Sequence, residues 1–178
     1  MGKIIRTMKE KWKGLLLFLV FCGGLIWLDQ WTKKLAVEHL KGKDPIVLWK
    51  GVFQLQYLEN RGAAFGMLQE RQAFFLLIGI IVFAAVVFAL YRMPFSRRYL
   101  PLGFCMALIV SGAAGNMIDR LRQHFVVDFF YFSLIDFPIF NVADCYVTVA
   151  AVLLVGLLLW FYGDEELEVF SWKKGAKT

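Results

Sequence analysis

Four aspartates and two asparagines lie close together between Gly115 and Asp144, in the sequence GNMIDRLRQHFVVDFFYFSLIDFPIFNVAD. Carboxylates can accept and donate protons, and amides can hold a carboxylate or a polar substrate by hydrogen bonds. Aromatic and β-branched residues surround them, a combination for which an ordinary membrane loop has no physical reason. The stretch is therefore the first candidate for chemistry, and the polar residues singled out in it are Asn116, Asp119, Arg120, Asp128, Asp136, Asn141 and Asp144.

Asp128 and Asp144 are the two acids whose surroundings best suit acid–base chemistry. Asp128 is a single acid within an apolar, β-prone run, and Asp144 opens an apolar segment three residues after Asn141. Two carboxylates within a few Å of each other in surroundings of low polarity cannot both ionise, so such a pair holds one proton near neutral pH. One carboxylate can then take a proton from water while the other protonates a leaving nitrogen, as an aspartic peptidase requires. A compatible interpretation is helix capping by Asn141 and Asp144, worth about 1 kcal/mol.

The composition indicates a membrane protein. Of the 178 residues, 60% are hydrophobic, and the mean hydropathy of +0.61 exceeds that of soluble domains. The net charge of +6 does not indicate a nucleic-acid partner, because the basic residues flank apolar segments and form no basic face. The cysteines have no metal-ligand spacing, and neither a Ser-His-Asp order nor a phosphate-binding glycine-rich loop is evident. We expect no metal and no cofactor.

Four apolar segments are long enough to cross a bilayer. The first, about residues 14–33, lacks a small-x-small cleavage site, so we expect a retained helix and not a cleaved signal peptide. The second and third, about 73–91 and 99–118, are joined by a loop with three arginines and no acid, and the fourth spans about 141–162. The basic N-terminal segment and the arginine loop place both termini in the cytoplasm, with residues 115–144 on the outer face.

A polar loop at about residues 44–68 separates the first two segments. Ile46–Trp49 and Val52–Leu58 lie on either side of Lys50-Gly51, which predicts a β-hairpin resting on the membrane surface. The small residues that follow Asn60 let backbones approach closely, and the Asn60 amide can donate and accept hydrogen bonds. The expected fold class is mainly α and integral membrane, a four-transmembrane-helix bundle with a small extracytoplasmic β-hairpin or sheet cradle. We expect one membrane domain over residues 1–178.

Two further sets of charged residues adjoin the apolar segments. Asp29 and Lys33 are four residues apart on the continuation of the first helix and can pair. Asn116, Asp119 and Arg120 follow a run of small residues and occupy adjoining positions on one face of the third helix. A charged side chain near hydrocarbon costs about 2.5 to 3.5 kcal/mol, so it should face the bundle interior and have a partner there.

Five sequence blocks recur together in one known family. They are Asp29–Lys33 (DQWTK), Asn60–Gly66 (NRGAAFG), Gly115–Arg120 (GNMIDR), Val126–Phe129 (VVDF) and Phe140–Asp144 (FNVAD). In these blocks the chain resembles the bacterial lipoprotein signal peptidases, also called signal peptidase II, over nearly its whole length. The resemblance implies four transmembrane helices, an outer-face β-cradle and an aspartyl dyad that cleaves diacylglyceryl-modified prolipoproteins just before the lipidated cysteine.

The resemblance also implies roles for individual residues. Asp128 and Asp144 match the catalytic pair. The residues expected to hold the substrate or the dyad are Asn60, Asn116, Arg120 and Asn141, and those expected to give structural support are Asp29, Lys33 and Asp119. The implied partners are a lipidated prolipoprotein and membrane lipid, with no nucleic acid, for a monomer in the bacterial cytoplasmic (inner) membrane. Residues 131–138 and the acidic tail match no motif of the family.

Two alternatives from other functional classes remain open from the residues alone. Intramembrane carboxylates also mark proton relays, so a proton-coupled small membrane transporter is one alternative. Its charges should lie near mid-membrane, yet the acids here cluster at one face and no internal repeat is visible. The other alternative is a structural or assembly protein with a polar outer cap, in which alanine at both aspartates should affect only folding.

Overall fold

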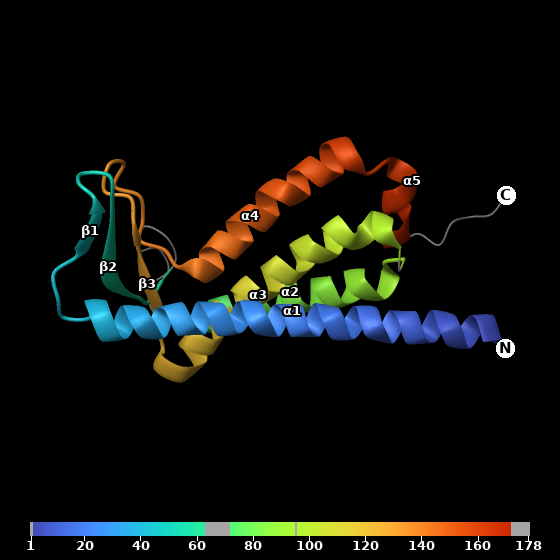
Figure 1. Cartoon of the computed structure of the whole chain (residues 1–178), viewed down its shortest axis with the longest axis horizontal. Helices are drawn as coiled ribbons and strands as arrows, with labels where there is room; N and C mark the ends of the chain where they lie inside the picture. The colour runs from blue at the N-terminus through green and yellow to red at the C-terminus, as the bar shows by residue number, and fades with distance from the viewer. Residues whose placement is uncertain (1, 63–71, 95, 172–178) are drawn as a thin grey trace.

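The structure, a computed structural model, describes residues 2–62, 72–94 and 96–171, with side chains from Lys11 onwards. The long helices run along the longest axis of the molecule, and the strands gather at one end (Figure 1). Within the described ranges four helices are long and apolar enough to cross a membrane, and they span Lys11–Leu40, Gln72–Arg92, Arg97–Gln123 and Val142–Phe161. The fold class expected from the sequence is confirmed.

The first helix, α1, is much longer than the apolar segment that predicts it. It runs over Gly2–Leu40, 39 residues, which at 1.5 Å per residue is about 58 Å, nearly twice a hydrocarbon core of about 30 Å. Gly42 follows it with a left-handed φ of 71°, a conformation typical of glycine just beyond a helix end. The last turns of α1 support the sheet, because Ala36 and Leu40 pack against Val127 and Phe129.

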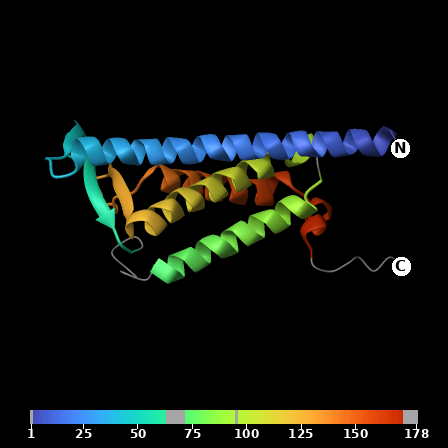
Figure 2. The same ribbon diagram turned by 90° about the horizontal axis from the view of Figure 1, so that it is seen from below.

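Helix α3 (Leu100–Gln123) is the centre of the bundle. It contacts α1, α4 (Val142–Gly156) and α2 (Gln72–Arg92), and Figure 2 shows it between α1 and α2. In its most apolar 18-residue window 56% of residues are buried, against 11% in each other span, so the other helices present apolar faces to lipid. Small residues allow the close packing: a Cβ at Gly112 would lie 2.6 Å from the Ala143 carbonyl oxygen of α4.

Three antiparallel strands, β1 (Ile46–Trp49), β2 (Phe53–Asn60) and β3 (Val126–Tyr131), form a sheet in that order. The predicted hairpin is β1 and β2. The third strand comes from the segment between α3 and α4, and its pairing sets Asn60 opposite Val126 and Leu58 opposite Asp128. The sheet therefore brings the polar loop after α1 to the acid-rich stretch about 70 residues later.

Helix α4 (Val142–Gly156) continues as a π-helical stretch, η3 (Leu157–Phe161). A short helix, α5 (Asp164–Leu167), and a 3₁₀ turn, η4 (Glu168–Phe170), follow it. They lie at the end of the bundle opposite the sheet (Figure 1). There they meet the α2–α3 connection, whose 3₁₀ turn is η2 (Arg97–Tyr99). The Ala63–Gly66 part of the NRGAAFG block lies outside the described residues.

Candidate functional site

The Asp128 carboxylate lies on β3 and is 1% exposed. Its Oδ1 accepts a hydrogen bond from Asn141 Nδ2 at 2.6 Å, and its Oδ2 accepts one from Asn60 Nδ2 at 2.7 Å. Pairing of β2 with β3 places Asn60 here, and Asn60 Oδ1 in turn accepts the Gly62 backbone N–H at 3.0 Å. Two amides therefore hold a carboxylate that has almost no contact with solvent.

The Asp144 carboxylate lies in the first turn of α4. Its Oδ2 accepts the backbone N–H of Asn141 at 3.2 Å, while Asn141 Oδ1 accepts the backbone N–H of Asp144 at 3.1 Å. This reciprocal pair is a capping box, so the predicted capping is confirmed. The other oxygen, Oδ1, accepts a hydrogen bond from Asn116 Nδ2 of α3 at 2.8 Å. One carboxylate oxygen of Asp144 thus belongs to the capping box of α4, and the other accepts a hydrogen bond from α3.

The two carboxylates are connected through the amides of Asn141 and Asn116. Asn141 Nδ2 donates both to Asp128 and to Asn116 Oδ1, the latter at 3.1 Å. Burial and, after it, the negative charge of Asp144 raise the pKa of Asp128 from 3.8 to about 7, although the amides of Asn60 and Asn141 oppose the rise. Near neutral pH the Asp128 carboxyl is therefore available both as an acid and as a base.

Lys33 is the centre of a second, adjoining network. It is 3% exposed, and its Nζ lies 2.9 Å from Asp29 Oδ2, 2.9 Å from Asp119 Oδ2 and 2.8 Å from Asn116 Oδ1. An ammonium group has three donors, and each of them has an acceptor here. The predicted Asp29–Lys33 pair is confirmed, and Asp119 and Asn116 bring α3 into it.

The two acids that pair with Lys33 also hold the backbone beside the two acids of the candidate site. Asp119 Oδ2 accepts the N–H of Val127, the residue before Asp128, at 3.4 Å. Asp29 Oδ1 accepts the N–H of Ala143, the residue before Asp144, at 3.0 Å. The network thus fixes the chain at both aspartates, which is the arrangement that a supporting role requires.

Gln30 belongs to this network although the sequence analysis gave it no role. Its amide nitrogen lies 2.9 Å from Asp119 Oδ1, 3.2 Å from Asp29 Oδ2 and 3.2 Å from the Gly115 carbonyl oxygen. The available signal was its position three residues before Lys33, which puts both side chains on one face of α1. Its partners on α3 are too distant in sequence to be inferred from it.

Arg120 lies at the edge of the site. Its guanidinium donates to the Gly62 carbonyl oxygen at 3.2 Å and to the Asn116 carbonyl oxygen at 3.5 Å, and it lies 4.3 Å from the centre of the Phe75 ring. Within the described ranges it forms no ion pair with either aspartate of the site. The substrate-binding role of Arg120 stays a prediction.

Asp136 lies outside the network. It accepts a hydrogen bond from the Tyr131 hydroxyl at 2.6 Å.

The fold and the site together define a class of protein. It is a multi-pass membrane protein with an acid-rich polar site where a four-helix bundle meets a small sheet. A family model described as "Signal peptidase (SPase) II" matches residues 21–160. The lipoprotein signal peptidase of Caldanaerobacter subterraneus subsp. tengcongensis is 41% identical over 148 residues, which is 82% of this chain and 97% of that protein. The lipoprotein signal peptidase of Streptococcus thermophilus is 44% identical over 136 residues, 76% of this chain and 87% of that protein.

Solved structures are similar as well. A bacterial membrane enzyme determined by the in meso method at 2.3 Å resolution has a TM-score of 0.71 and 30% identity, and the match covers 80% of this chain and 87% of that one. A second, at 1.9 Å resolution, has a TM-score of 0.70 and 29% identity, with coverage of 82% and 94%. The chain belongs to the signal peptidase II family. It is a peptidase that removes signal peptides from prolipoproteins in a bacterial inner membrane.

Proposed function

We propose that Asp128 and Asp144 are the aspartyl dyad of this peptidase. In this proposal the enzyme cleaves a diacylglyceryl-modified prolipoprotein just before its lipidated cysteine. The observation that carries the proposal is the hydrogen-bonded connection of the two carboxylates through Asn141 and Asn116. Burial and the neighbouring charge hold the pKa of Asp128 at about 7, the range in which one carboxyl can exchange a proton at physiological pH.

Hydrolysis then needs only water and the two carboxyl groups. The ionised carboxylate removes a proton from a water molecule, whose oxygen attacks the carbonyl carbon of the scissile amide. The protonated carboxyl gives its proton to the amide nitrogen, the C–N bond breaks, and the products are a free carboxyl end and a free amino end. The proton taken from water restores the shared proton of the pair.

The amides and the supporting network have distinct tasks in this proposal. Asn60 and Asn141 orient Asp128, while Asn116 orients Asp144. Arg120, beside Gly62 at the edge of the site, contacts the substrate backbone. Asp29, Lys33 and Asp119 hold the residues that precede the dyad, and the geometry required for catalysis depends on them.

The proposal also includes the orientation of the enzyme in the membrane. The basic N-terminal segment and the arginines of the α2–α3 connection favour cytoplasmic placement of both termini. The dyad then lies at the outer face, and the acyl chains of the substrate lie between helices so that only the cleavage site reaches the carboxylates. One membrane domain supplies all the site residues, so a monomer with membrane lipid around it suffices.

The decisive experiment compares three aspartate variants of the purified enzyme. Cleavage of a lipidated prolipoprotein should fall by about 100- to 10,000-fold for Asp128→Asn and for Asp144→Asn, the range that general acid–base catalysis contributes. Asp136→Asn is the matched control, because it removes an outer-face acid outside the network and asparagine tolerates the positive φ of 46° found there. Its activity should match the wild type.

Folding must be monitored in the same variants. Thermal unfolding in detergent distinguishes a lost catalytic group from a collapsed fold, since Asp128→Asn and Asp144→Asn are nearly isosteric. Retained cleavage by either variant would overturn the assignment of the dyad. A chelator should leave wild-type cleavage unchanged, and inhibition by the chelator would instead point to metal-dependent chemistry.

A further inference from the structure

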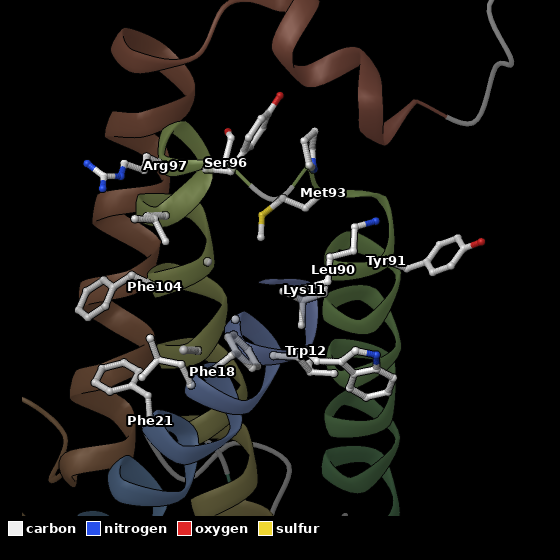
Figure 3. A pocket seen from close by; sticks show the side chains of 18 of the residues that line it. Lys11, Trp12, Phe18, Phe21, Leu90, Tyr91, Met93, Ser96, Arg97 and Phe104 are labelled. Carbon is white, nitrogen blue, oxygen red and sulfur yellow. The ribbon is translucent and has the colours of Figure 1, made fainter. Parts of the chain in front are cut away.

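A large cavity lies between α1, α2 and α3 at the end of the bundle opposite the sheet (Figure 3). Its volume is about 1010 Å³, and its mostly apolar lining includes Phe18, Phe21 and Phe104. No residue of the networks around Asp128 and Lys33 lines it. The cavity therefore takes no part in positioning the dyad, which rests on the side chains of those two networks.

Gln30 is the member of the Lys33 network that has no task in the proposed function. Its Nε2 lies 2.9 Å from Asp119 Oδ1 and 3.2 Å from the Gly115 carbonyl oxygen, both on α3. The same nitrogen lies 3.2 Å from Asp29 Oδ2 on α1. A primary amide has two N–H donors, which these three acceptors share. One neutral side chain thus contacts both of the acids that pair with Lys33.

The two oxygens of Asp119 are held by different donors. Its Oδ2 lies 2.9 Å from the Lys33 ammonium and accepts the Val127 N–H at 3.4 Å, while its Oδ1 accepts the hydrogen bond from Gln30. A buried carboxylate oxygen that loses its donor keeps the cost of desolvation. Without the amide, the carboxylate would turn to bring Oδ1 to Lys33, and this rotation releases the Val127 N–H.

Asp29 is oriented by the same amide. Its Oδ1 accepts the Ala143 N–H at 3.0 Å, and its Oδ2 lies 2.9 Å from the Lys33 ammonium and 3.2 Å from the amide nitrogen of Gln30. The missing side chain of Gly115 leaves room for this carboxylate, because a Cβ there would overlap Asp29 Oδ2. The amide therefore holds Asp29 on the side away from the backbone of α4.

We infer that Gln30 is a positioning residue of the peptidase. It acts through Asp119 and Asp29, which hold the backbone N–H groups of the residues immediately before Asp128 and Asp144, and it touches no reacting atom itself. The inference rests on the proposed dyad. A misplacement of about 1 Å caused by a change away from the chemistry can lower a rate about 100-fold, so small rotations of these two acids matter for cleavage.

A purely structural role of Gln30 is the competing interpretation. Its hydrogen bond to the Gly115 carbonyl oxygen joins α1 to α3, and loss of that bond alone would lower the Tm without changing kcat of the folded enzyme. A positioning role instead lowers kcat and leaves KM unchanged, because the interaction that is lost matters in the transition state and not in substrate binding. Kinetics of the folded protein therefore separate the two roles.

Gln30→Leu removes the amide and keeps most of the side-chain volume. With the purified full-length enzyme and a lipidated prolipoprotein, kcat should fall about 10- to 100-fold while KM is unchanged. Gln56→Leu is the matched control, since it makes the same replacement on β2, where the amide is bonded to Gln54, and it should retain the wild-type kcat. Thermal unfolding in detergent measures the structural part separately. A wild-type kcat in folded Gln30→Leu would overturn the inference.

Gln30→Glu is nearly isosteric and adds the pH profile as a second readout. The charged groups facing this position are Asp29 and Lys33 of α1 and Asp119 of α3, and α4 adds the Tyr146 hydroxyl, which interacts electrostatically with Asp29. Three carboxyl groups around one ammonium cannot all ionise. At acid pH the introduced carboxyl is therefore protonated and can donate to Asp119 as the amide does. At higher pH it ionises and repels Asp119.

The measured quantity is the ratio of kcat for Gln30→Glu to kcat for the wild type, which cancels the pH dependence of the wild type itself. This ratio should fall as the pH rises, whereas the ratio for Gln56→Glu should stay constant. A constant ratio for Gln30→Glu would refute the positioning role. Failure of the dyad has a different signature, because retained cleavage by Asp128→Asn or Asp144→Asn removes the dyad and this inference together. Lost cleavage in those two variants with a wild-type kcat in Gln30→Leu removes only the role of Gln30.

Discussion

The two ends of the molecule use similar ion pairs in opposite surroundings. At the sheet end, Lys33 pairs with Asp29 and Asp119, and all three side chains are at most 6% exposed. At the other end, Arg98 pairs with Glu166, and these side chains are 43% and 32% exposed. Arg98 also stacks over the Phe161 ring, 3.8 Å from its centre.

This difference separates charges that determine geometry from charges that attach a segment. A buried ion that loses its partner keeps the full cost of its desolvation, whereas an exposed ion recovers solvation by water. The buried cluster also holds the backbone N–H groups of Val127 and Ala143, so a change there moves the candidate dyad. The exposed cluster secures the C-terminal segment without contact with the site.

The largest effect should come from Lys33→Met. This change leaves the carboxylates of Asp29 and Asp119 buried without their cation, and breaking a buried pair in this way costs about 3 to 5 kcal/mol. Thermal unfolding in detergent should show a large drop in Tm, and cleavage activity should fall with it because the residues before the dyad lose their anchors.

Lys34→Met is the matched control for Lys33→Met. Lys34 is the next residue, its side chain is 73% exposed, and its only ion pair within the described residues is a 3.8 Å contact with Glu38. Its loss should change stability by at most about 0.5 kcal/mol. Equal changes in Tm for the two variants would show that burial does not distinguish the clusters.

A smaller effect is expected for Gly115→Ala, which tests how closely α1 and α3 approach. The added Cβ would overlap Asp29 Oδ2 and lie 3.0 Å from its Cγ. Because Asp29 holds the Ala143 N–H, the start of α4 must shift or the carboxylate must move. Such overpacking costs about 1 to 3 kcal/mol, and both Tm and cleavage activity should decrease.

Gly103→Ala is the control in the same helix. A Cβ at Gly103 has ordinary contact with the Met93 methyl carbon at 3.7 Å, so no overlap opposes the gain in helix propensity, about 1 kcal/mol. Its Tm should equal or exceed that of the wild type. A wild-type Tm for Gly115→Ala would mean that the small residue is not required at this approach.

The pH dependence of cleavage tests the electrostatics of the sheet end. The pKa of Asp128 is raised from 3.8 to about 7 by burial and by the charge of Asp144. The protonated form is therefore lost as the pH rises through about 7, and kcat/KM should decline tenfold per pH unit above that value. The contribution of the protonated Asp128 carboxyl to folding stability also decreases as the pH rises. It is fully present below pH 3.8 and disappears as the pH rises through about 7.

Asn60→Ala should move this decline in kcat/KM to higher pH. The Asn60 amide favours the ionised form and lowers the pKa of Asp128, so its removal raises that pKa further. Gln56→Ala, on the same strand but bonded to Gln54, should leave the pH of this decline unchanged. A shift of the decline to lower pH in Asn60→Ala would contradict the hydrogen bond from Asn60 to Asp128.

Local features of the site could be predicted from the sequence. The i,i+4 spacing indicates the Asp29–Lys33 pair, and the Asn141-x-x-Asp144 spacing indicates the capping box, because both depend on geometry within one helix. The hairpin is local as well, since β1 and β2 flank a short turn. The family resemblance supplied the peptidase class, which the residues alone left open against a transporter and a structural or assembly protein.

Contacts between distant segments could not be predicted from the residues. The bonds from Asn60 to Asp128 and from Lys33 to Asn116 join residues 68 and 83 positions apart, and no local periodicity encodes them. The full length of α1 exceeds the apolar segment at both ends, because its first turns are rich in basic residues and its last turns, which pack against the sheet, are not continuously apolar. A role for Gln30 could not be predicted from the residues either, because its partners Gly115 and Asp119 belong to α3.

The smallest effect should come from Glu166→Gln at the other end. Its hydrogen bonds with Arg98 lower the pKa of Glu166 from 4.5 to about 2. A lowered pKa gives stability that is present above pH 4.5 and lost as the pH falls through about 2, opposite in sign to Asp128. At pH 7 the Tm of Glu166→Gln should therefore be only slightly below that of the wild type, with unchanged cleavage, and the gap should shrink in acid. Glu165→Gln, at the neighbouring exposed position, is the control and should show no gap at either pH. A loss of Tm in Glu166→Gln as large as that in Lys33→Met would reverse the proposed order of the two clusters.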